Sequence, residues 1–340
     1  MRKRSRLDPL PGPRIPFGDV SAAAPGLALL PPPVAVRPRQ RCVALRGRTP
    51  KLYRSGEGPF SHQCEPECEP ELGLARSREV PLGNKVPRRM LLNVVVGLAI
   101  LYAGLCGALF LCQRSMIYFP PPISECKGGS LTALEIENGR VLVSTRPRDG
   151  PDALIYLGGN AENVSLNLPD LSTAFPGHAL YLLHYRGYCG SSGRPSEEAL
   201  FGDALALVDR VRALHPNVVI VGRSLGSGIA IRVASLRTVS RLVLVTPYDS
   251  LQEIAARQLP YVPVRWLLRD KFESWRYAPQ VTAPTLIIAA ELDEVIPRAS
   301  SELLRTRFHH GVASMVVIAG TGHNTISASR DYLRLMKDGR

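Results

Sequence analysis

Residues 222–228 read GRSLGSG, a serine between two glycines directly after the apolar run NVVIVG. A serine in the spacing Gly-x-Ser-x-Gly, with a strand before it and a helix after it, predicts a nucleophile elbow that exposes the hydroxyl at a sharp turn. A plain glycine turn is the alternative, and the pattern by itself does not exclude it. Because the pattern occurs once in the chain and the stretch SGIAIRVASL follows it, we expect Ser224 to be a nucleophile.

A serine hydroxyl is a weak nucleophile at neutral pH, so a base must take its proton and an acid must orient that base. Around a nucleophile elbow these groups follow in the chain order Ser, Asp or Glu, His. The candidate base is His323 in GTGHN, in a loop after the apolar run SMVVIAG. His309 and His310 precede the same run, so we expect them at the opposite edge of the sheet, in surface or capping roles.

The candidate acids follow two other apolar runs. Asp293 in AAELDEVIP comes directly after TLIIAA, and we expect it to orient His323. Asp249 in VTPYDS also follows a predicted strand and is the alternative acid; otherwise we expect it to cap the next helix. Glu291 and Glu294 are expected to be solvated loop charges.

Acyl transfer by a serine also needs two backbone N–H groups that bind the oxyanion of the tetrahedral intermediate. The first is expected from Leu225, the residue after the nucleophile. The second is expected from Asn160 in LIYLGGNAENVS, where Gly158 and Gly159 permit close approach. A plain glycine-rich turn is the alternative there.

The apolar runs that would position these groups alternate with amphipathic stretches. The clearest helix is predicted for residues 196–215, with Ser196 as its cap and two glutamates in its first turn. Apolar strands alternating with helices predict an α/β fold with a mostly parallel sheet covered on both faces, in which ligands bind at the carboxyl ends of the strands. The predicted strands are RVLVST, ALIYLGG, ALYLLHY, NVVIVG, RLVLVT, TLIIAA and SMVVIAG.

Residues 90–112 carry no charged side chain. As a helix this segment is about 34 Å long, enough to cross a hydrocarbon layer of about 30 Å. A buried core helix is the alternative. Arg and Lys residues are denser before the span than after it, which predicts a cytoplasmic N-terminus and an exported C-terminal part.

Residues 1–89 hold 17 Lys and Arg, 8 Asp and Glu, and 15 of the 30 prolines. Such a segment buries too little apolar surface to fold, so we expect a disordered basic tail. It is a solvated extension, a product of a mis-set start upstream of residue 90, or a contact for nucleic acid or acidic lipid.

Two pairs of cysteines lie outside the predicted span. Cys64 and Cys68 lack the second ligand pair of a zinc site. Cys126 and Cys189 lie in the exported part, and the sequence leaves open whether they form a disulfide.

Taken together, these motifs resemble those of the membrane-anchored α/β-hydrolases, a group that includes palmitoyl-protein thioesterases and proteins labelled serine aminopeptidase-like. The resemblance covers residues 90–335 and rests on QRSMIYFP, GGNAEN, HYRGYCGSSGRPSEEALFGDA, GRSLGSG, VTPYDSLQEIA, APTLIIAAELDEVIP and GTGHN. The prolines at 120–122 mark a linker, which we place over residues 113–130, and the remaining residues 131–340 have the length of one α/β-hydrolase domain. The resemblance implies the following roles: nucleophile Ser224, acid Asp293, base His323, and an oxyanion hole of Leu225 and Asn160.

Two positions depart from the family pattern. Cys189 stands where YRGYGxSxG has glycine, and an Ala-Ala pair replaces the usual His-Gly before the acid loop. Neither change removes a reacting group, although Cys189 would narrow the loop beside the site. Arg186 in that loop is expected to be a structural hydrogen-bonding residue.

Residues 251–280 form a predicted cap that is too short for a large lid, so we expect a fairly open site. Its apolar side chains either line an acyl pocket, touch the bilayer or pack into the core, and the sequence does not choose among these roles. They are Tyr261, Val262, Trp266 and Leu267.

These features predict a membrane-anchored serine hydrolase that cleaves carboxylic esters or thioesters and needs no metal or organic cofactor. The alternatives are a serine peptidase or amidase of the same fold and a catalytically silent binding protein. The expected partners are an acyl substrate and, through residues 90–112, a membrane; we expect no nucleic-acid partner, and the oligomeric state stays open. We expect the catalytic domain outside the cytoplasm, with a bacterial inner membrane facing the periplasm preferred over an internal eukaryotic membrane.

Overall fold

A computed structural model of the chain describes residues 87–126, 130–137 and 139–339. The predicted disordered tail therefore lies almost wholly outside the described residues, and so do Cys64 and Cys68.

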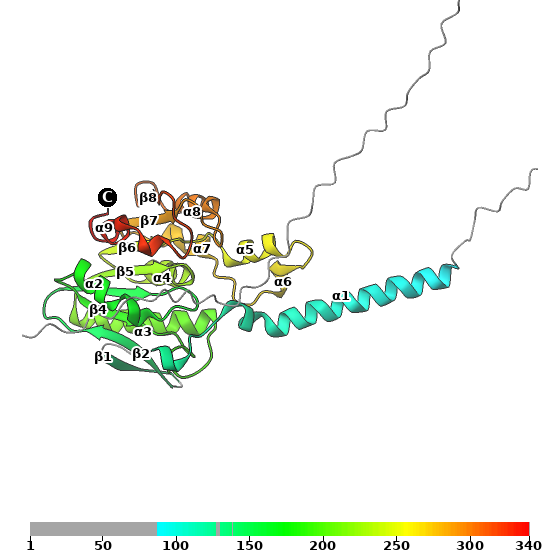
Figure 1. Ribbon diagram of the computed structural model, residues 1–340, viewed down its shortest axis with the longest axis horizontal. Coiled ribbons are helices and arrows are strands. Elements are labelled where there is room, and N and C mark those ends of the chain that lie inside the picture. The colour runs from blue at the N-terminus through cyan, green and yellow to red at the C-terminus, as the bar shows by residue number, and fades with distance from the viewer. Residues whose placement is uncertain (1–86, 127–129, 138, 340) are drawn as a thin grey trace, which may run out of the picture. The chain divides into compact units, whose positions relative to one another are not determined.

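Eight strands of the described chain form one sheet (Figure 1), in the order β1-β2-β4-β3-β5-β6-β7-β8. The pairs β1–β2 and β2–β4 are antiparallel, and every other neighbouring pair is parallel. The strands are β1 (Ser130–Ile136), β2 (Gly139–Arg146), β3 (Asp152–Leu157), β4 (Ala179–Leu183), β5 (Asn217–Arg223), β6 (Arg241–Val245), β7 (Thr285–Ala290) and β8 (Ala313–Ile318).

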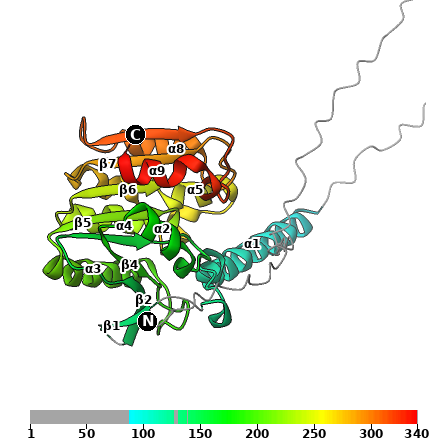
Figure 2. The same cartoon turned by 60° about the vertical axis from the view of Figure 1, so that its left-hand side comes forward.

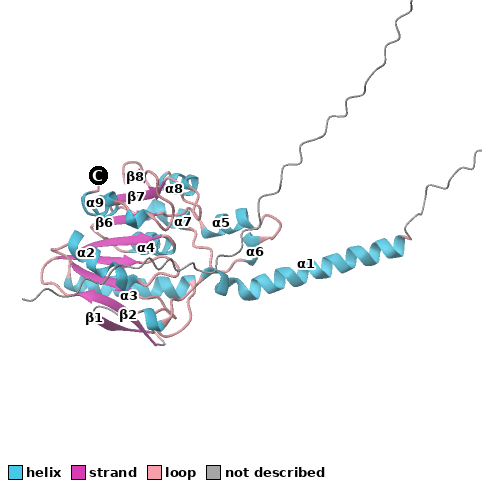
Figure 3. Ribbon diagram, viewed as in Figure 1, coloured by secondary structure: helices cyan, strands magenta, loops and turns pink. Residues whose placement is uncertain are grey.

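Helices cover both faces of this sheet (Figure 3). One face packs against α3 (Glu197–Leu214), α4 (Leu225–Leu236) and α8 (Arg298–Arg305), and the other against α2 (Leu168–Ala174) and α9 (Arg330–Asp338). Alternate residues of a central strand serve the two faces: in β3, Ile155 belongs to the first core and Tyr156 to the second. A strand buried on both sides must be apolar at every position, and this requirement produces the continuous runs in the sequence. The predicted fold class is thereby confirmed.

The strand β1 was not predicted from the sequence. β1 is an edge strand in which Leu134 is the buried side chain, so its sequence SLTALEI lacks a strong apolar run. Short one-turn helices complete the domain: η1 (Ile123–Glu125), η2 (Val164–Asn167), η3 (Ala278–Gln280) and η4 (Ile326–Ala328).

The helix α1 (Arg88–Ile117) contains the predicted membrane span and extends beyond it at both ends. It is long and apolar enough to cross a membrane. The helix continues past residue 112 into the predicted linker because its last turns are held by protein contacts. Gln113 Nε2 donates to the carbonyl of Leu267 at 3.2 Å, and Arg114 Nε lies 3.0 Å from Asp270 Oδ2. The helix ends where Tyr118 becomes extended, just before three prolines.

We call residues 251–280 the insert. It holds α5 (Leu251–Gln258), α6 (Val264–Leu267), α7 (Ser274–Tyr277) and η3. Figures 1 and 2 show α5 on the side of the domain from which α1 projects, and the bonds from Gln113 and Arg114 place residues 267–270 against the last turns of α1.

Cys126 and Cys189 form a disulfide, which settles the pairing that the sequence left open. The bond joins the segment after α1 to the loop after β4, across 63 positions of the chain. Cys189 has a φ of 52°, in the left-handed region where the family pattern places glycine. The segment that leaves α1 is therefore tied covalently to a loop at the carboxyl end of the sheet.

Candidate active site

Ser224 occupies the turn between β5 and α4. Its backbone has φ 48° and ψ −116°, a conformation that residues other than glycine rarely adopt and that is characteristic of a nucleophile elbow. The two flanking glycines are required by space. A Cβ at Gly222 would lie 2.6 Å from the Cβ of Ala230, and one at Gly226 would collide with the carbonyl oxygen of Leu157 at the end of β3.

The structure brings Ser224, His323 and Asp293 together from three separate loops. His323 Nε2 lies 3.0 Å from Ser224 Oγ, and His323 Nδ1 lies 2.9 Å from Asp293 Oδ2. The side chains of His323 and Asp293 are 8% and 3% exposed, so water competes little for these bonds. This arrangement can pass a proton from a hydroxyl to an imidazole that a carboxylate orients.

Asp293 is itself held by its own loop. Its Oδ1 accepts the backbone N–H groups of Val295 at 3.0 Å and Ile296 at 2.7 Å. These bonds fix the carboxylate directly after β7, whose neighbour β8 leads into the loop of His323. Neighbouring strands in a parallel sheet deliver their following loops to the same edge, which is why two residues 30 positions apart meet.

Asp249, the alternative acid, lies elsewhere. Its Oδ1 accepts from Arg307 Nε at 3.1 Å, on the side of α8, and no bond links it to His323 within the described chain. It does not cap the following helix either, because Ser250 is the N-cap of α5 and accepts from Glu253 N. The expectation of a cap at Asp249 is wrong by one residue.

The two predicted oxyanion donors flank the serine. Leu225 is the first residue of α4, so its N–H is one of the amides that a helix leaves without an internal partner. On the other side Gly159 lies so near that a Cβ there would sit 3.5 Å from Ser224 Cβ. The Asn160 side-chain oxygen accepts from Phe119 N at 3.0 Å and from Tyr188 Oη at 2.8 Å, which fixes the loop from two sides. No partner is found in the described residues for the backbone N–H of Asn160 or of Leu225.

Glu162 fastens this loop to the elbow, a role that the sequence did not reveal. Its carboxylate accepts the N–H of Gly159, and it accepts Tyr156 Oη at 2.7 Å. Arg223, the residue before the nucleophile, has Nη1 3.4 Å from Glu162 Oε2. Burial opposes the charge of Arg223, yet Glu162 and Tyr156 hold the pKa of its guanidinium above the ordinary value. One largely buried ion pair, between Arg223 and Glu162, thus connects both halves of the candidate oxyanion hole.

We expect Glu162→Gln to lower kcat for ester hydrolysis by about 10- to 100-fold while KM changes by less than about twofold. The amide keeps the volume but loses the charge that pairs with Arg223, so the Gly159–Asn160 loop is held less firmly in the transition state. The measurement is steady-state kinetics of the full-length protein. Glu198→Gln, which removes an exposed pair with Arg232, should leave both constants within about twofold of wild type. If Glu162→Gln instead raised KM by about 10- to 100-fold and left kcat unchanged, this positioning role would be contradicted.

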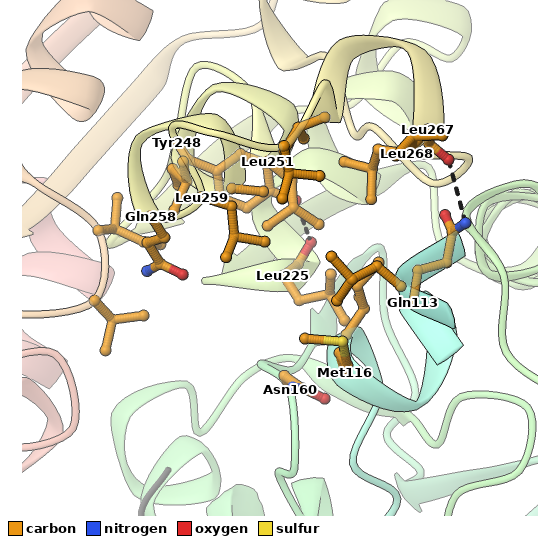
Figure 4. Close-up of a pocket in the computed structure, with 18 of the residues that line it drawn as sticks. Gln113, Met116, Asn160, Leu225, Tyr248, Leu251, Gln258, Leu259, Leu267 and Leu268 are labelled. Carbon is orange, nitrogen blue, oxygen red and sulfur yellow. Dashed lines mark hydrogen bonds between the residues drawn. The ribbon is translucent and has the colours of Figure 1, made fainter. Parts of the chain in front are cut away.

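An apolar cavity of about 300 Å³ opens beside the serine (Figure 4). Ser224, Leu225 and Asn160 lie at it, and most of the rest of its wall is hydrocarbon, with Gln113, Tyr248 and Gln258 as the polar side chains. One side is built from the insert, including Leu251, Leu259 and Leu267, and the opposite side from the last turns of α1, including Gln113 and Met116. The insert alone predicted an open site; α1 adds a wall that was not expected.

A second serine–histidine cluster lies deep in the fold. His184 Nε2 is 2.8 Å from Ser144 Oγ and 3.2 Å from Ser165 Oγ, and all three side chains are buried. Burial lowers the pKa of His184 to about 4, so the ring is neutral near pH 7. No carboxylate is bonded to this ring in the described chain, so the cluster lacks the acid that would orient a catalytic histidine, and we interpret it as a structural polar network.

The remaining sequence candidates also lie away from the serine. His309 and His310 are exposed before β8, at the opposite strand end from His323. Arg186 forms a bidentate ion pair with the buried Asp203, in which Nε and Nη2 each lie 2.7 Å from a carboxylate oxygen. Among the described residues no group of His, Cys, Asp and Glu side chains could hold a metal ion.

Comparison with known proteins places this geometry in a family. The family model described as the alpha/beta hydrolase fold matches residues 152–272. An uncharacterised protein of Mycobacterium tuberculosis H37Rv is 34% identical over 250 residues, covering 68% of this chain and 88% of the relative. The human alpha/beta hydrolase domain-containing protein 17B is 28% identical over 194 residues, covering 54% of this chain and 64% of that protein.

Solved structures share the fold at low identity. Est1E from Butyrivibrio proteoclasticus, determined with ferulic acid bound, superposes with a TM-score of 0.51 at 16% identity, covering 61% of this chain and 95% of that one. The Pyrococcus furiosus esterase Pf2001 gives 0.51 at 18% identity, covering 65% of this chain and 97% of the esterase. The sheet order, the elbow and the relatives agree, and the chain belongs to the alpha/beta hydrolase family.

Proposed function

We propose that the chain is a membrane-anchored serine hydrolase that cleaves carboxylic ester or thioester bonds through an acyl-enzyme intermediate. The observation that carries this proposal is the hydrogen-bonded series Asp293–His323–Ser224 beside an apolar cavity. A serine 3.0 Å from a base, with that base held by a buried carboxylate, has the partners that nucleophilic attack requires.

The reaction would proceed in two halves. Ser224 Oγ attacks the acyl carbonyl carbon while its proton passes to His323 Nε2, and the carbonyl oxygen becomes an oxyanion bound by the N–H groups of Leu225 and Asn160. When the bond to the leaving group breaks, His323 returns the proton to the departing alcohol or thiol. Water, deprotonated by His323, then releases the carboxylic acid and restores the serine hydroxyl.

The cavity favours an apolar acyl group over a peptide. Its wall offers few polar atoms, whereas a peptide needs partners for its backbone amides. Esters and thioesters also ask less of leaving-group protonation than amides do. An amide of the same acyl group is therefore expected to be the poorest of the three substrates.

The location is proposed from α1 and the disulfide. α1 meets the length and hydropathy of a membrane span, and basic residues are denser before it than after it. The Cys126–Cys189 bond lies on the far side of α1 from the N-terminus, and such bonds persist in oxidising compartments. We therefore assign the catalytic domain to the non-cytoplasmic side of the membrane.

The test is labelling of the full-length protein in detergent with a fluorophosphonate, which reacts with activated serines. Wild type should be labelled and Ser224→Ala should not, while Ser235→Ala, on the same helix α4 but with its hydroxyl bonded to the Arg232 carbonyl, should label normally. Ester, thioester and amide substrates with one common acyl group then rank the leaving groups. A folded wild type that neither labels nor hydrolyses any of the three would favour the silent binding protein instead.

A further inference from the structure

Part of the insert runs alongside α1, from the last turns of that helix back to its middle. Tyr102 Oη, in the middle of the apolar run, donates to the carbonyl of Tyr261 at 2.8 Å. Further along α1, the Gln113 side chain bonds both the carbonyl of Leu267 and, at 2.7 Å, the N–H of Arg269. Tyr102 and Gln113 are about 16 Å apart along the helix. Residues 261–269 therefore follow α1 over about half of a hydrocarbon layer of about 30 Å.

The part of the insert nearest the middle of α1 is apolar and exposed. It consists of residues 259–263, which read LPYVP, and we call it the tip. Tyr261 and, on α6, Trp266 are each 88% exposed, which is unusual for large side chains in water. Arg257 precedes the tip, Arg265 follows it and pairs with Glu253 at 3.0 Å, and Arg269 lies where the segment meets Gln113 of α1. Exposed aromatic side chains with nearby basic groups are the composition that proteins place at a membrane surface.

The backbone of this segment suits a medium without water. Hydrogen bonds to nearby carbonyls satisfy most of its N–H groups, and its two prolines have none to satisfy. In hydrocarbon each unsatisfied amide costs several kcal/mol, so an irregular segment at membrane depth needs this internal pairing. The bonded N–H groups are those of Leu259, Val262, Val264, Trp266, Leu267 and Leu268.

The same segment forms the wall of the cavity that reaches the serine. Leu259 and Val262 of the tip line it, and so do Leu109 and Phe110 on the neighbouring turns of α1. Leu259 is also 36% exposed, so the cavity wall continues onto the outer surface of the tip. An acyl chain that lies between the tip and α1 would point along the cavity toward Ser224.

We infer that the tip lies in the bilayer beside α1 and that the acyl chain of a membrane-resident ester or thioester enters the cavity directly from the hydrocarbon. The fate of that acyl chain rests on the proposed hydrolase function. The depth of the tip rests instead on the proposed membrane span of α1, on the bond between Tyr102 and Tyr261, and on the exposure of Tyr261 and Trp266; it is independent of the hydrolase chemistry.

The depth is tested by fluorescence, because the chain has two tryptophans. Full-length Trp275→Phe retains Trp266, and full-length Trp266→Phe retains Trp275 on α7, which packs against α4. Each is reconstituted in phosphatidylcholine vesicles whose acyl chains carry bromine, a short-range quencher. Trp266 should lose about half or more of its emission, and Trp275 should lose clearly less. Quenching of Trp266 no stronger than that of Trp275 would overturn the inference.

The route of the acyl chain is tested by kinetics on the Tyr261→Asp, Trp266→Asp double variant in unbrominated vesicles. The vesicle-borne substrates are a palmitoyl ester of glycerol and a palmitoyl thioester of a short peptide, and the soluble substrate is a butyryl thioester. We expect kcat/KM to fall at least about tenfold for the palmitoyl substrates, because the aspartates oppose burial of the tip, and to change less than about twofold for the butyryl thioester. Which palmitoyl substrate wild type prefers distinguishes a lipid from an acylated peptide.

The matched control is the Leu214→Asp, Leu236→Asp double variant, which puts the same charges on exposed leucines at the ends of α3 and α4. It should hydrolyse all three substrates as wild type does. Equal losses on soluble and vesicle-borne substrates in the tip variant, or no loss on either, would overturn the proposed route. A wild type that hydrolyses none of them would instead refute the proposed function, and the depth of the tip would then be decided by the quenching experiment.

Discussion

Replacing His323 by alanine is expected to lower kcat for ester hydrolysis by about 10⁶-fold, the largest single effect in the molecule. The imidazole is the one base bonded to Ser224 Oγ in the described chain, at 3.0 Å, and without it the hydroxyl proton has no acceptor. Residual turnover of about 10³-fold above the uncatalysed rate should survive, because the candidate oxyanion donors and the cavity stay in place.

Single-turnover acylation with a chromogenic ester measures this loss directly. Alanine substitutions at His309 and His310 serve as controls, because these residues are exposed before β8 and were the remaining histidines downstream of the nucleophile. Both control variants should keep kcat within about twofold of wild type. A His323→Ala protein with more than about a hundredth of wild-type activity would mean that another group takes the serine proton.

Asp293→Asn is expected to lower kcat by about 10⁴-fold with little change in KM. The amide keeps the shape of the side chain and can still accept the N–H groups of Val295 and Ile296. It cannot stabilise the imidazolium that forms during attack, and it favours the wrong tautomer of His323. The loss should therefore appear in the chemical step rather than in folding or substrate binding.

The matched variant is Asp249→Asn, because the sequence alone allowed either aspartate to be the acid. Asp249 pairs with Arg307 at 3.1 Å and is remote from the bonds of His323. We expect this variant to retain kcat within about twofold and to unfold at a lower temperature, since the amide cannot form the ion pair that the buried Asp249 carboxylate makes with Arg307. Steady-state kinetics and thermal unfolding of both variants separate the two roles. A large loss of kcat in Asp249→Asn, with Asp293→Asn active, would reverse the assignment.

Taken together, the contacts make α1 part of the candidate site. Its last turns contribute Phe110 and Met116 to the cavity wall, and the segment after it donates the N–H of Phe119 to Asn160. Arg114 and Tyr118 both bond Asp270, which fixes the helix end against the insert. Kinetic work on this protein therefore calls for the full-length chain, because a fragment that begins after α1 lacks one wall of the site.

Local sequence patterns were sufficient for the fold class and for the three residues, Ser224, Asp293 and His323, that the structure brings together. The elbow is specified within seven residues, since Gly222 and Gly226 are the positions where a Cβ would collide with Ala230 or with the backbone of β3. The central strands could be predicted from the sequence because burial on both faces requires an apolar residue at every position. Asp293 and His323 could be assigned because a parallel sheet carries the loops after neighbouring strands to one edge. The edge strand β1 was missed because one buried side chain leaves almost no pattern.

What the sequence could not supply are contacts between residues far apart in the chain. Tyr102 meets Tyr261 across 159 positions, Arg114 meets Asp270 across 156, and the two bridged cysteines are 63 apart. Such pairs leave no periodic signal, because they depend on how finished elements pack and not on the propensity of any segment. The sequence by itself therefore determined which groups could react and on what kind of sheet. Only the tertiary structure decided that α1 and the insert together line the cavity beside Ser224, and that Glu162 connects the candidate oxyanion loop to the elbow.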